Sequence, residues 1–327
     1  MTNTIKRTAM ERPAGFDTEQ KESRYHIMTS CDDKLAPYVA VLMVSVAKAL
    51  KEEPVSFYLF HSRVDRHNIE MLKALGGEFE NMRFEEIVVP EPERYDALAK
   101  HGSGWSGEAY YSLCAHLLLP ENVHRVMYLD AGDTMVLGDI KPYYDYDFQG
   151  NSLIVTGSSY KIENGEVIPY SGQDLGDWNN KLPYILRGLF NSGSYLINLD
   201  KLRQNGFTLY DYEYLAQKLA EILGEENKKI YWGDQGLLSA AFVGDIRYYG
   251  FPEIRSIWYM PYNFCVWYFD QMQEKPEYGQ SVVHFAGTPY KPWGGIPNLH
   301  RTVSGRRKAS SVKRTEAGTG RVFLSVA

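Results

Sequence analysis

The sequence predicts an α/β protein in which helices flank a mixed, mostly parallel central sheet. Strand and helix patterns alternate along the first half of the chain, which is typical of such sheets. The composition, 44% hydrophobic and 23% charged residues over 327 positions, is that of a soluble globular protein. The longest apolar run, residues 36–50, is too short to span a bilayer and contains Lys48.

Seven segments of the first half carry the alternating pattern. The expected strands are 25–30, 55–62, 82–89 and 125–130, and the expected helices are 37–50, 64–77 and 108–120. Pro37 suits a first helical turn, Gly76 and Gly77 end the second helix, and Pro120 stops the third. In open sheets of this kind, ligands collect at the carboxyl ends of the strands.

The second half is less regular. Its expected strands are 151–158, 193–200 and 281–287, and its expected helices are 210–223, which Gly224 ends, and 234–242. We expect three parts in the chain: a flexible tail at 1–23, one domain at 24–293 and a basic tail at 294–327. From His300 on, seven Lys and Arg residues face one acid, Glu316, so we expect disorder. A solvated tail is the preferred interpretation, and weak contact with an anionic membrane surface is the alternative.

Charge and cysteine content restrict the partners and the compartment. The net charge of −6 argues against nucleic acid as a main partner. Cys31, Cys114 and Cys265 are far apart and odd in number, which argues against zinc and disulfide frameworks. The N-terminal segment has no apolar core and is not a signal peptide. We therefore expect a cytoplasmic protein, with peripheral contact at the inner membrane face as a possibility.

Two carboxylates follow the strand at 125–130 in the sequence YLDAGD. Asp130 and Asp133 are separated only by Ala131 and Gly132, so both could approach one hard cation. The alternative is an Asx-type turn with solvated acids. In VVHFAGTPYKPW, His284 could be a third metal ligand or a structural histidine. Lys291 could neutralise a diphosphate or lie on the surface.

Polar residues also precede one strand and begin one helix. Asn191 and Ser192 stand before the strand at 193–200, and Asp234 and Gln235 stand at the start of a helix. These groups could hold sugar hydroxyls, although Asp234 could simply be an N-cap. The sequence contains no Gly-x-Ser-x-Gly motif, no Walker loop and no dinucleotide-binding glycine motif after the first strand.

Taken in order, five elements over residues 24–293 resemble family 8 of the glycosyltransferases. They are the turn Ser30-Cys31-Asp32-Asp33 before APYVAVLMVSV, then YLD…D, FNSGSYLINLDKLR, GDQGLLSAAF and HFAGTPYKPW. Family 8 contains retaining enzymes, among them bacterial galactosyl- and glucosyltransferases, and is similar to glycogenin. The resemblance implies a GT-A fold, a UDP-glucose or UDP-galactose donor and a divalent metal, usually Mn²⁺, with Mg²⁺ as the alternative. The acceptor could be a saccharide, a glycolipid or a protein.

The resemblance also implies roles for individual residues. Asp130, Asp133 and His284 match the metal ligands, and Ser30, Cys31 and Asp32 match the contacts to the base. Asn191, Asp234 and Gln235 match the donor-sugar pocket, and Gly287 and Lys291 match the diphosphate contacts. Gln235 would lie near the anomeric carbon, and because a neutral amide is a poor nucleophile, we favour front-face displacement. A non-catalytic nucleotide-sugar-binding protein and a nucleotidyltransferase are the other hypotheses.

The chain differs from the family pattern in four places. Gly132 lengthens the usual Asp-x-Asp, which puts the metal geometry in question. Lys34 or Leu35 stands where the family often has a tyrosine that stacks on uracil. Ser112 stands where it often has an arginine, which removes a cation near the donor. The basic tail does not resemble the aromatic helical sequence that usually follows KPW.

Overall fold

The computed structural model describes residues 23–102, 105–156, 182–224, 229–249 and 281–286, and the strand backbone at 160–163, 166–169 and 264–265. The main sheet of this part has seven strands in the order β10-β6-β9-β4-β1-β2-β3. The strands are Tyr25–Ser30 (β1), Val55–His61 (β2), Met82–Val88 (β3), Arg125–Leu129 (β4), Leu153–Val155 (β6), Ser194–Asn198 (β9) and Ile246–Tyr248 (β10). Strand β9 is antiparallel to β4 and β6, whereas the other neighbouring strands are parallel. The predicted fold class, a mixed and mostly parallel sheet, is confirmed.

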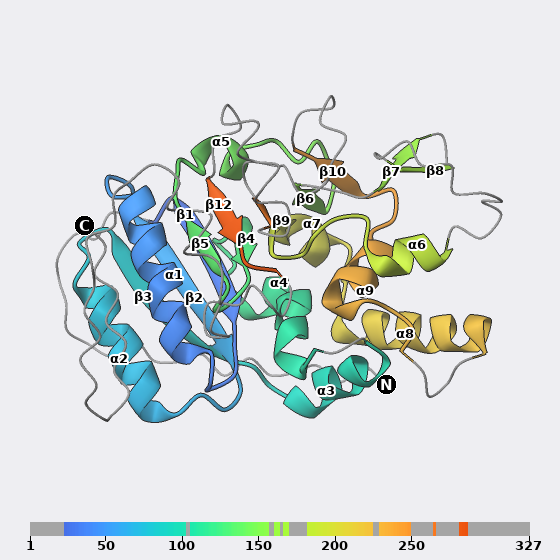
Figure 1. The fold of residues 1–327 in the computed structure, drawn as a ribbon, viewed down its shortest axis with the longest axis horizontal. Coiled ribbons are helices and arrows are strands. Elements are labelled where there is room, and N and C mark those ends of the chain that lie inside the picture. Colours follow the sequence, from blue (N-terminus) through green and yellow to red (C-terminus); the bar gives the residue numbers. More distant parts are fainter. Residues whose placement is uncertain are drawn as a thin grey trace, which may run out of the picture.

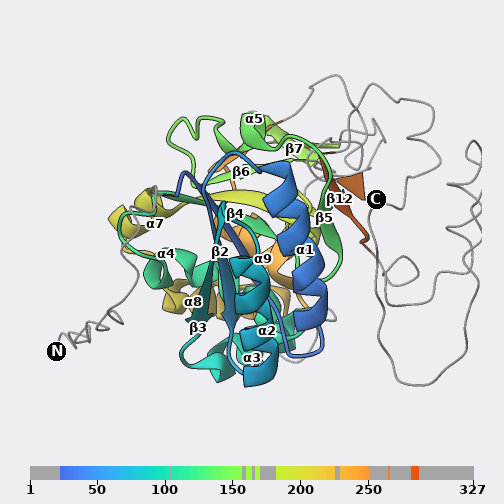
Figure 2. The same ribbon diagram turned by 90° about the vertical axis from the view of Figure 1, so that its left-hand side faces the viewer.

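Helices cover both faces of this sheet (Figure 1). They are Ala36–Ala49 (α1), Arg66–Gly77 (α2), Pro92–His101 (α3), the 3₁₀ helix Gly107–Cys114 (η1), Ala115–Leu118 (α4), Lys141–Tyr144 (α5), Leu182–Arg187 (α6), Leu199–Gln204 (α7), Leu209–Leu223 (α8) and Gly233–Ala241 (α9). Figure 2 shows α1 on one side of the sheet and α4, α7 and α8 on the other. A hairpin of Tyr160–Glu163 (β7) and Glu166–Pro169 (β8) lies outside the main sheet.

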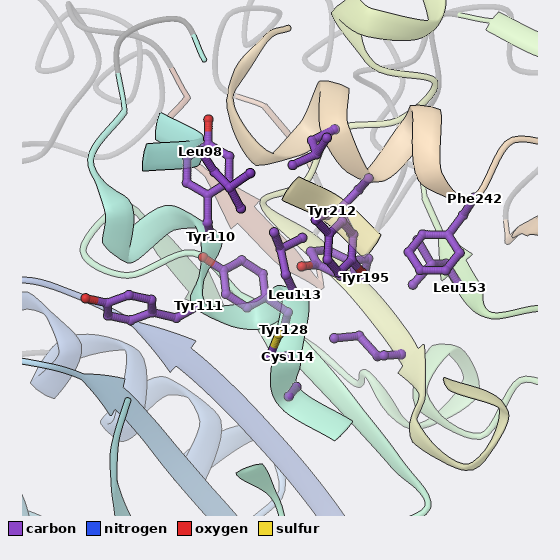
Figure 3. Packing of buried hydrophobic residues seen from close by; sticks show 14 of the residues in the cluster. Leu98, Tyr110, Tyr111, Leu113, Cys114, Tyr128, Leu153, Tyr195, Tyr212 and Phe242 are labelled. Atoms are coloured by element: carbon purple, nitrogen blue, oxygen red, sulfur yellow. The ribbon is translucent and has the colours of Figure 1, made fainter. Parts of the chain in front are cut away.

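The alternation of side chains along each strand divides the core into two clusters. On β1, Ile27 packs with α1 and α2, whereas Met28 packs with η1 and the later helices. The second cluster is unusually rich in tyrosine: Tyr110, Tyr128 and Tyr195 are buried together there (Figure 3). Buried tyrosines contribute large apolar areas, and their hydroxyls are normally paired. Tyr195 donates to Ser112 and Tyr128 donates to Asp130, whereas the Tyr110 hydroxyl has no hydrogen-bond partner among the described residues.

Strand order explains where a ligand would bind. From β1 the chain goes to β2 and β3 on one side, and it returns to β4 on the other side of β1. The crevice at the carboxyl ends of β1 and β4 is therefore the switch point of the sheet, where open α/β folds bind ligands. Because β9 runs the opposite way, its amino end lies at the same edge, with Ser194 opposite Leu129.

A second, three-stranded sheet approaches this edge. It consists of Thr134–Val136 (β5), Val282–His284 (β12) and Phe264–Cys265 (β11), in the order β11-β12-β5. Strands β5 and β12 are antiparallel, with His284 opposite Thr134. The amide of Phe285 donates to the carbonyl of Asp133 at 2.7 Å. This pairing brings the late strand to the carboxyl end of β4.

Several sequence predictions need correction. The segment predicted as one helix at 108–120 is the 3₁₀ helix η1 followed by the short helix α4. The strand predicted at 193–200 ends at Asn198, because its side chain accepts from the amide of Lys201 and caps α7. The strand predicted at 151–158 is confirmed at Leu153–Val155 and is wrong at 151, 152 and 156, whereas 157 and 158 lie outside the described residues. Helix α3 was not predicted at all. The limits of both tails stay predictions because 1–22 and 287–327 lie outside the described residues.

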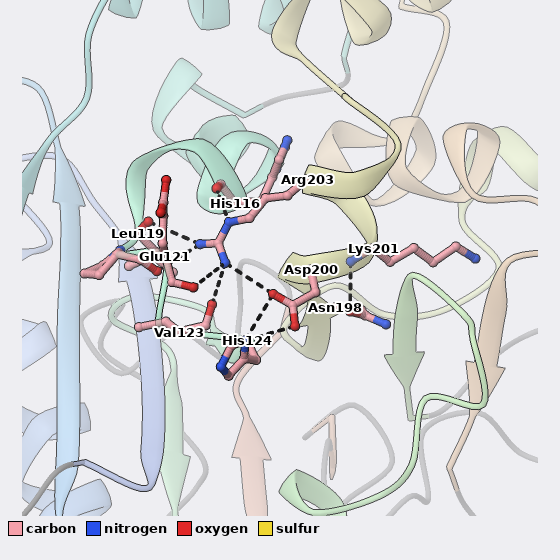
Figure 4. Close-up of polar contacts among 10 residues, drawn as sticks. His116, Leu119, Glu121, Val123, His124, Asn198, Asp200, Lys201 and Arg203 are labelled. Carbon is pink, nitrogen blue, oxygen red and sulfur yellow. Dashed lines mark hydrogen bonds and ion pairs between the residues drawn. The ribbon is translucent and has the colours of Figure 1, made fainter. Parts of the chain in front are cut away.

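One arginine fixes the turn that leads into β4. Arg203 on α7 donates to the carbonyls of His116, Leu119, Pro120, Glu121 and Val123, at 2.8 to 3.3 Å (Figure 4). Its side chain is only 20% exposed. The planar guanidinium supplies donors to the carbonyls of a helix end and of the turn that follows it. The start of β4, and so the position of the carboxylates at its end, is held from α7.

Candidate active site

Asp130 and Asp133 lie together after β4 because of a single glycine. Gly132 has φ of 82°, a conformation that residues with a Cβ rarely adopt. The turn directs both carboxylates toward His284, whose Nε2 lies 3.3 Å from Asp130 Oδ2 and 3.5 Å from Asp133 Oδ2. The side chain of Asp133 is 3% exposed, so the alternative of a turn with two solvated acids is wrong for that residue.

The imidazole of His284 is held from the opposite side by β9 and the turn before it. Its Nδ1 lies 3.0 Å from Asn191 Oδ1, and that oxygen also accepts from the amide of Gly193. A hydrogen bond from Nδ1–H to the amide oxygen leaves Nε2 as the acceptor that faces the carboxylates. Gly193 is required here, because a Cβ would lie 2.1 Å from His284 Nδ1.

These three side chains fit a divalent cation. One ligand atom from each of Asp130, Asp133 and His284 can be chosen so that all three lie within 4.8 Å of one another. Two carboxylates and a neutral imidazole are ligands that suit Mn²⁺, and carboxylate oxygens also suit Mg²⁺. A buried carboxylate such as Asp133 is normally paired with a cation or a metal. The inserted Gly132 therefore does not separate the two acids.

A cavity of about 340 Å³ opens at this cluster. Its lining comes from the ends of β1 and β4, from η1, from the start of α9 and from β12. The lining residues are Ser30, Cys31, Asp32, Leu35, Trp105, Ser106, Glu108, Ala109, Tyr128, Asp130, Ala131, Asp133, Asn191, Ser192, Trp232, Asp234, Gln235, His284 and Ala286. All of the predicted site residues that the structure describes line this one cavity.

Sequence comparison agrees with this arrangement. The profile of glycosyl transferase family 8 matches residues 26–296, which is most of the chain. The chain belongs to glycosyl transferase family 8. It is therefore a glycosyltransferase of a retaining family that takes its sugar from a nucleotide donor, and the resemblance noted in the sequence is confirmed. No curated protein sequence matches the chain significantly.

Solved structures show the same GT-A fold. The galactosyltransferase LgtC, crystallised with donor and acceptor sugar analogues, has a TM-score of 0.59 and 21% identity, covering 85% of this chain and 94% of LgtC. Mouse xyloside xylosyltransferase 1 has a TM-score of 0.52 and 16% identity, covering 82% and 99%. GlyE of Streptococcus pneumoniae TIGR4 has a TM-score of 0.52 and 17% identity, covering 83% and 57%. Identities this low establish the fold and leave donor and acceptor open.

Gln235 is held at both ends of its amide. Its Oε1 accepts from the amide of Ser192 at 3.2 Å, and its Nε2 donates to the carbonyl of Arg187 at 2.8 Å. Gly188, with φ of 112°, makes room for the side chain, because a Cβ there would lie 2.3 Å from Nε2. In this family 8 protein the side-chain amide of Gln235 is thus oriented before any ligand binds.

Asp234 is buried beside Gln235. Helix α9 begins at Gly233 with Trp232 as N-cap, so the alternative that Asp234 caps this helix is wrong. Burial, and then the charge of Asp130, raise the pKa of Asp234 to about 8. Its Oδ2 has no hydrogen-bond partner among the described residues, although buried polar atoms are normally paired. Burial therefore favours the protonated form of Asp234 in the metal-free protein, and its Oδ2 is available to a ligand.

The two acids in the turn after β1, Asp32 and Asp33, have different surroundings. Asp32 lines the cavity, and its Oδ1 accepts from the amide of Leu35 at 3.0 Å. Asp33 instead accepts from the amide of Asp65 and from Asn68, which fixes the turn against the start of α2. Of Lys34 and Leu35, the two residues predicted to stand where the family often has a tyrosine, Leu35 lines the cavity and adds an aliphatic surface there.

Two residues of the tyrosine cluster bear on the site. Ser112, at the place of the usual family arginine, is buried and accepts from the hydroxyl of Tyr195 at 2.8 Å. Tyr128, which the sequence placed in the expected strand at 125–130 with no role in the site, donates to Asp130 Oδ1 at 2.9 Å. Burial and the nearby Asp130 raise the pKa of Tyr128 far above its ordinary value, so its hydroxyl keeps the proton that it donates. Its position two residues before Asp130 in YLD was the available signal.

Two predicted residues, Gly287 and Lys291, lie outside the described residues, and their roles stay predictions. Within the described part of the chain, no helix has the length and hydropathy needed to cross a membrane.

Proposed function

We propose that this chain transfers glucose or galactose from a UDP-sugar to an acceptor hydroxyl with retention of configuration, and that it needs a divalent metal, Mn²⁺ in the first place. The observation that supports this most is the cluster of Asp130, Asp133 and His284 in the same cavity as Gln235. The cytoplasmic location and the acceptor, whether a free saccharide, a glycolipid or a protein, belong to the same proposal.

The site suits departure of a nucleoside diphosphate. Asp130, Asp133 and His284 would hold the cation, which supplies Lewis-acid stabilisation of charge on the leaving oxygens. Ser30, Cys31 and Asp32 would contact the base at the carboxyl end of β1, and Gly287 and Lys291 would contact the diphosphate. Asn191, which orients His284, adds a positioning role to the donor-pocket role predicted from the sequence.

The residues near the reacting carbon favour front-face displacement. Gln235 is a neutral amide whose orientation two backbone groups fix, so it can stabilise an oxocarbenium-like state but is a poor nucleophile. Asp234 is buried, its raised pKa favours the protonated form, and in that form it can donate to a donor-sugar hydroxyl. With neither group acting as an anionic nucleophile, we propose that the acceptor attacks from the face that the leaving group departs from. A trapped glycosyl–enzyme adduct in mass spectrometry would contradict this step.

The test is donor hydrolysis without acceptor. The protein is incubated with UDP-glucose or UDP-galactose and Mn²⁺, and UDP release is measured. We expect slow release that a chelator abolishes and that Asp133→Ala reduces at least a hundredfold. Asp139→Ala, which removes an exposed acid beyond β5, is the matched control and should release UDP at the parent rate. Binding of nucleotide sugars with no release of UDP would instead indicate a binding protein that has lost catalysis.

A further inference from the structure

Two indole rings lie exposed at the cavity and have no role in the chemistry above. Trp105 is 43% exposed and Trp232 is 48% exposed, and both line the cavity. Their ring centroids are 5.6 Å apart, with an interplanar angle of 59°. Tryptophan is usually well buried, and adjacent exposed aromatic rings beside a cavity are typical of ligand-binding surfaces.

The two rings are brought together by pairing of two chain segments that are distant in sequence. Gly102 and Tyr231 form a parallel β-bridge, and the amide of Ile230 donates to the carbonyl of His101 at 2.7 Å. The hydroxyl of buried Tyr231 donates to the carbonyl of Leu98 at 2.6 Å. The segment that carries Trp232 is therefore fastened to the end of α3, close to Trp105, before any ligand binds.

The ring of Trp105 lies close over the backbone of Gly233. Gly233 has φ of 59°, and a Cβ there would lie 3.2 Å from the ring of Trp105. Within the described residues, neither indole N–H has a hydrogen-bond partner. The pair thus offers two apolar ring faces and two N–H donors, and Ser106 and Glu108 add polar groups next to Trp105 in the cavity lining.

We propose that Trp105 and Trp232 form the acceptor subsite and bind a pyranose ring by stacking on its C–H face. Sugars combine an apolar face with hydroxyls at the rim, which matches aromatic rings bordered by N–H, hydroxyl and carboxylate groups. This inference rests on the proposed glycosyl transfer, because an acceptor is needed only if transfer occurs.

Position favours the acceptor over the donor as the occupant. Trp232 is three residues from Gln235, the residue proposed to lie at the anomeric carbon. An acceptor hydroxyl must reach that carbon. The proposed contacts to the base, Ser30 to Asp32, lie instead at the end of β1. The indole pair comes from the segments before η1 and α9, so the two ligands would enter the cavity from different elements.

The test measures binding of methyl β-D-galactopyranoside and methyl β-D-glucopyranoside by saturation-transfer NMR and NMR titration. The parent protein should bind at least one of them, with saturation transfer to protons of the axial C–H face. Trp105→Ala and Trp232→Ala should each weaken binding about tenfold or more, as truncation of a central tryptophan does in other interfaces. Trp105→Phe and Trp232→Phe, which keep a ring, should have intermediate affinity and guard against misfolding of the alanine variants.

Tyr214→Ala is the matched control, because Tyr214 is an exposed aromatic residue (50%) on α8, away from the cavity lining. It should bind both glycosides like the parent. The proposal is overturned if the parent binds neither glycoside, if all four tryptophan variants bind like the parent, or if UDP with Mn²⁺ displaces the glycoside. UDP release by the parent protein is measured separately. Glycoside binding without UDP release would contradict the proposed transfer and leave the subsite standing, and the reverse result would contradict only the subsite.

Discussion

Removal of one buried hydroxyl should weaken metal binding although the hydroxyl itself is not a ligand. In Tyr128→Phe, Asp130 Oδ1 loses the donor at 2.9 Å that restricts rotation of its carboxylate. The other oxygen, Oδ2, is the one that lies 3.3 Å from His284 Nε2. A carboxylate that has lost one of its restraints must be ordered further when a cation binds, and this entropy cost lowers the affinity.

The structure indicates the magnitude. A hydrogen bond to a charged group contributes about 1.5–3 kcal/mol, which corresponds to roughly a 10- to 150-fold change in affinity. The side chain of Asp130 is 33% exposed, so water replaces part of the lost bond. We therefore expect the lower end of the range that is typical for partners of metal ligands, about a tenfold weaker affinity for Mn²⁺.

Tyr195→Phe is the matched control. Tyr195 is buried in the same cluster, with its ring centroid 5.1 Å from that of Tyr128, and its hydroxyl donates to Ser112 rather than to a ligand. Both variants should lower the melting temperature by similar amounts. Titration of Mn²⁺ followed by electron paramagnetic resonance of the free ion gives the affinity directly and does not depend on turnover. Equal affinities for Mn²⁺ in the parent and in Tyr128→Phe, or equal losses in the two variants, would refute the reasoning.

Three further predictions concern the site and its support. Gly193→Ala should displace the ring of His284 and abolish Mn²⁺ binding in the same titration, whereas Gly77→Ala, where a Cβ has open space, should not change it. Asp234 should contribute a fall in the melting temperature of the metal-free protein as the pH rises from about 4 to 8, because folded Asp234 keeps its proton up to about pH 8 and the unfolded chain does not. The other titrating groups are the same in parent and variant, so a comparison with Asp234→Asn isolates this contribution. Asp234→Asn should flatten this dependence, and an unchanged slope would contradict the assigned pKa. Arg203→Lys should lower the free energy of unfolding by about 2 kcal/mol or more in urea, since one ammonium cannot replace a guanidinium that serves five carbonyls.

The hydrophobic periodicity of the sequence was sufficient to predict the strands and helices of the first half of the sheet. The strands at 25–30, 55–61 and 82–88 and the helices between them have strong periodicity and clear end signals, such as Gly76 and Gly77. Helix α3 was missed because only Tyr95, Leu98 and Ala99 are buried on it, which leaves a weak apolar stripe. The 3₁₀ geometry of η1 also escaped prediction, because the apolar content of this segment fits either kind of helix.

Residue type and the family resemblance predicted the metal-ligand candidates Asp130, Asp133 and His284. They did not predict the geometry that brings these residues together. Nothing in the local sequence of residues 194–198 predicts that β9 is antiparallel to its neighbours β4 and β6. This antiparallel direction places Asn191, just before β9, beside His284. The conformation of Gly132 and the antiparallel pairing of β5 with β12 are likewise tertiary results. Trp105 and Trp232 carry no motif, and only their exposure beside the cavity identifies them.

The pairing of β5 with β12 also has a consequence for the order in which the protein is made. Asp130 and Asp133 belong to the middle of the chain, whereas His284 is synthesised about 150 residues later, so the site stays incomplete through most of translation. A cation held by all three side chains would close a loop of about that length, and cross-links of long loops reduce the entropy of the unfolded chain most. The cation would then stabilise the fold only after β12 has been synthesised. Nascent chains that end before β12 would be unable to bind manganese with all three side chains.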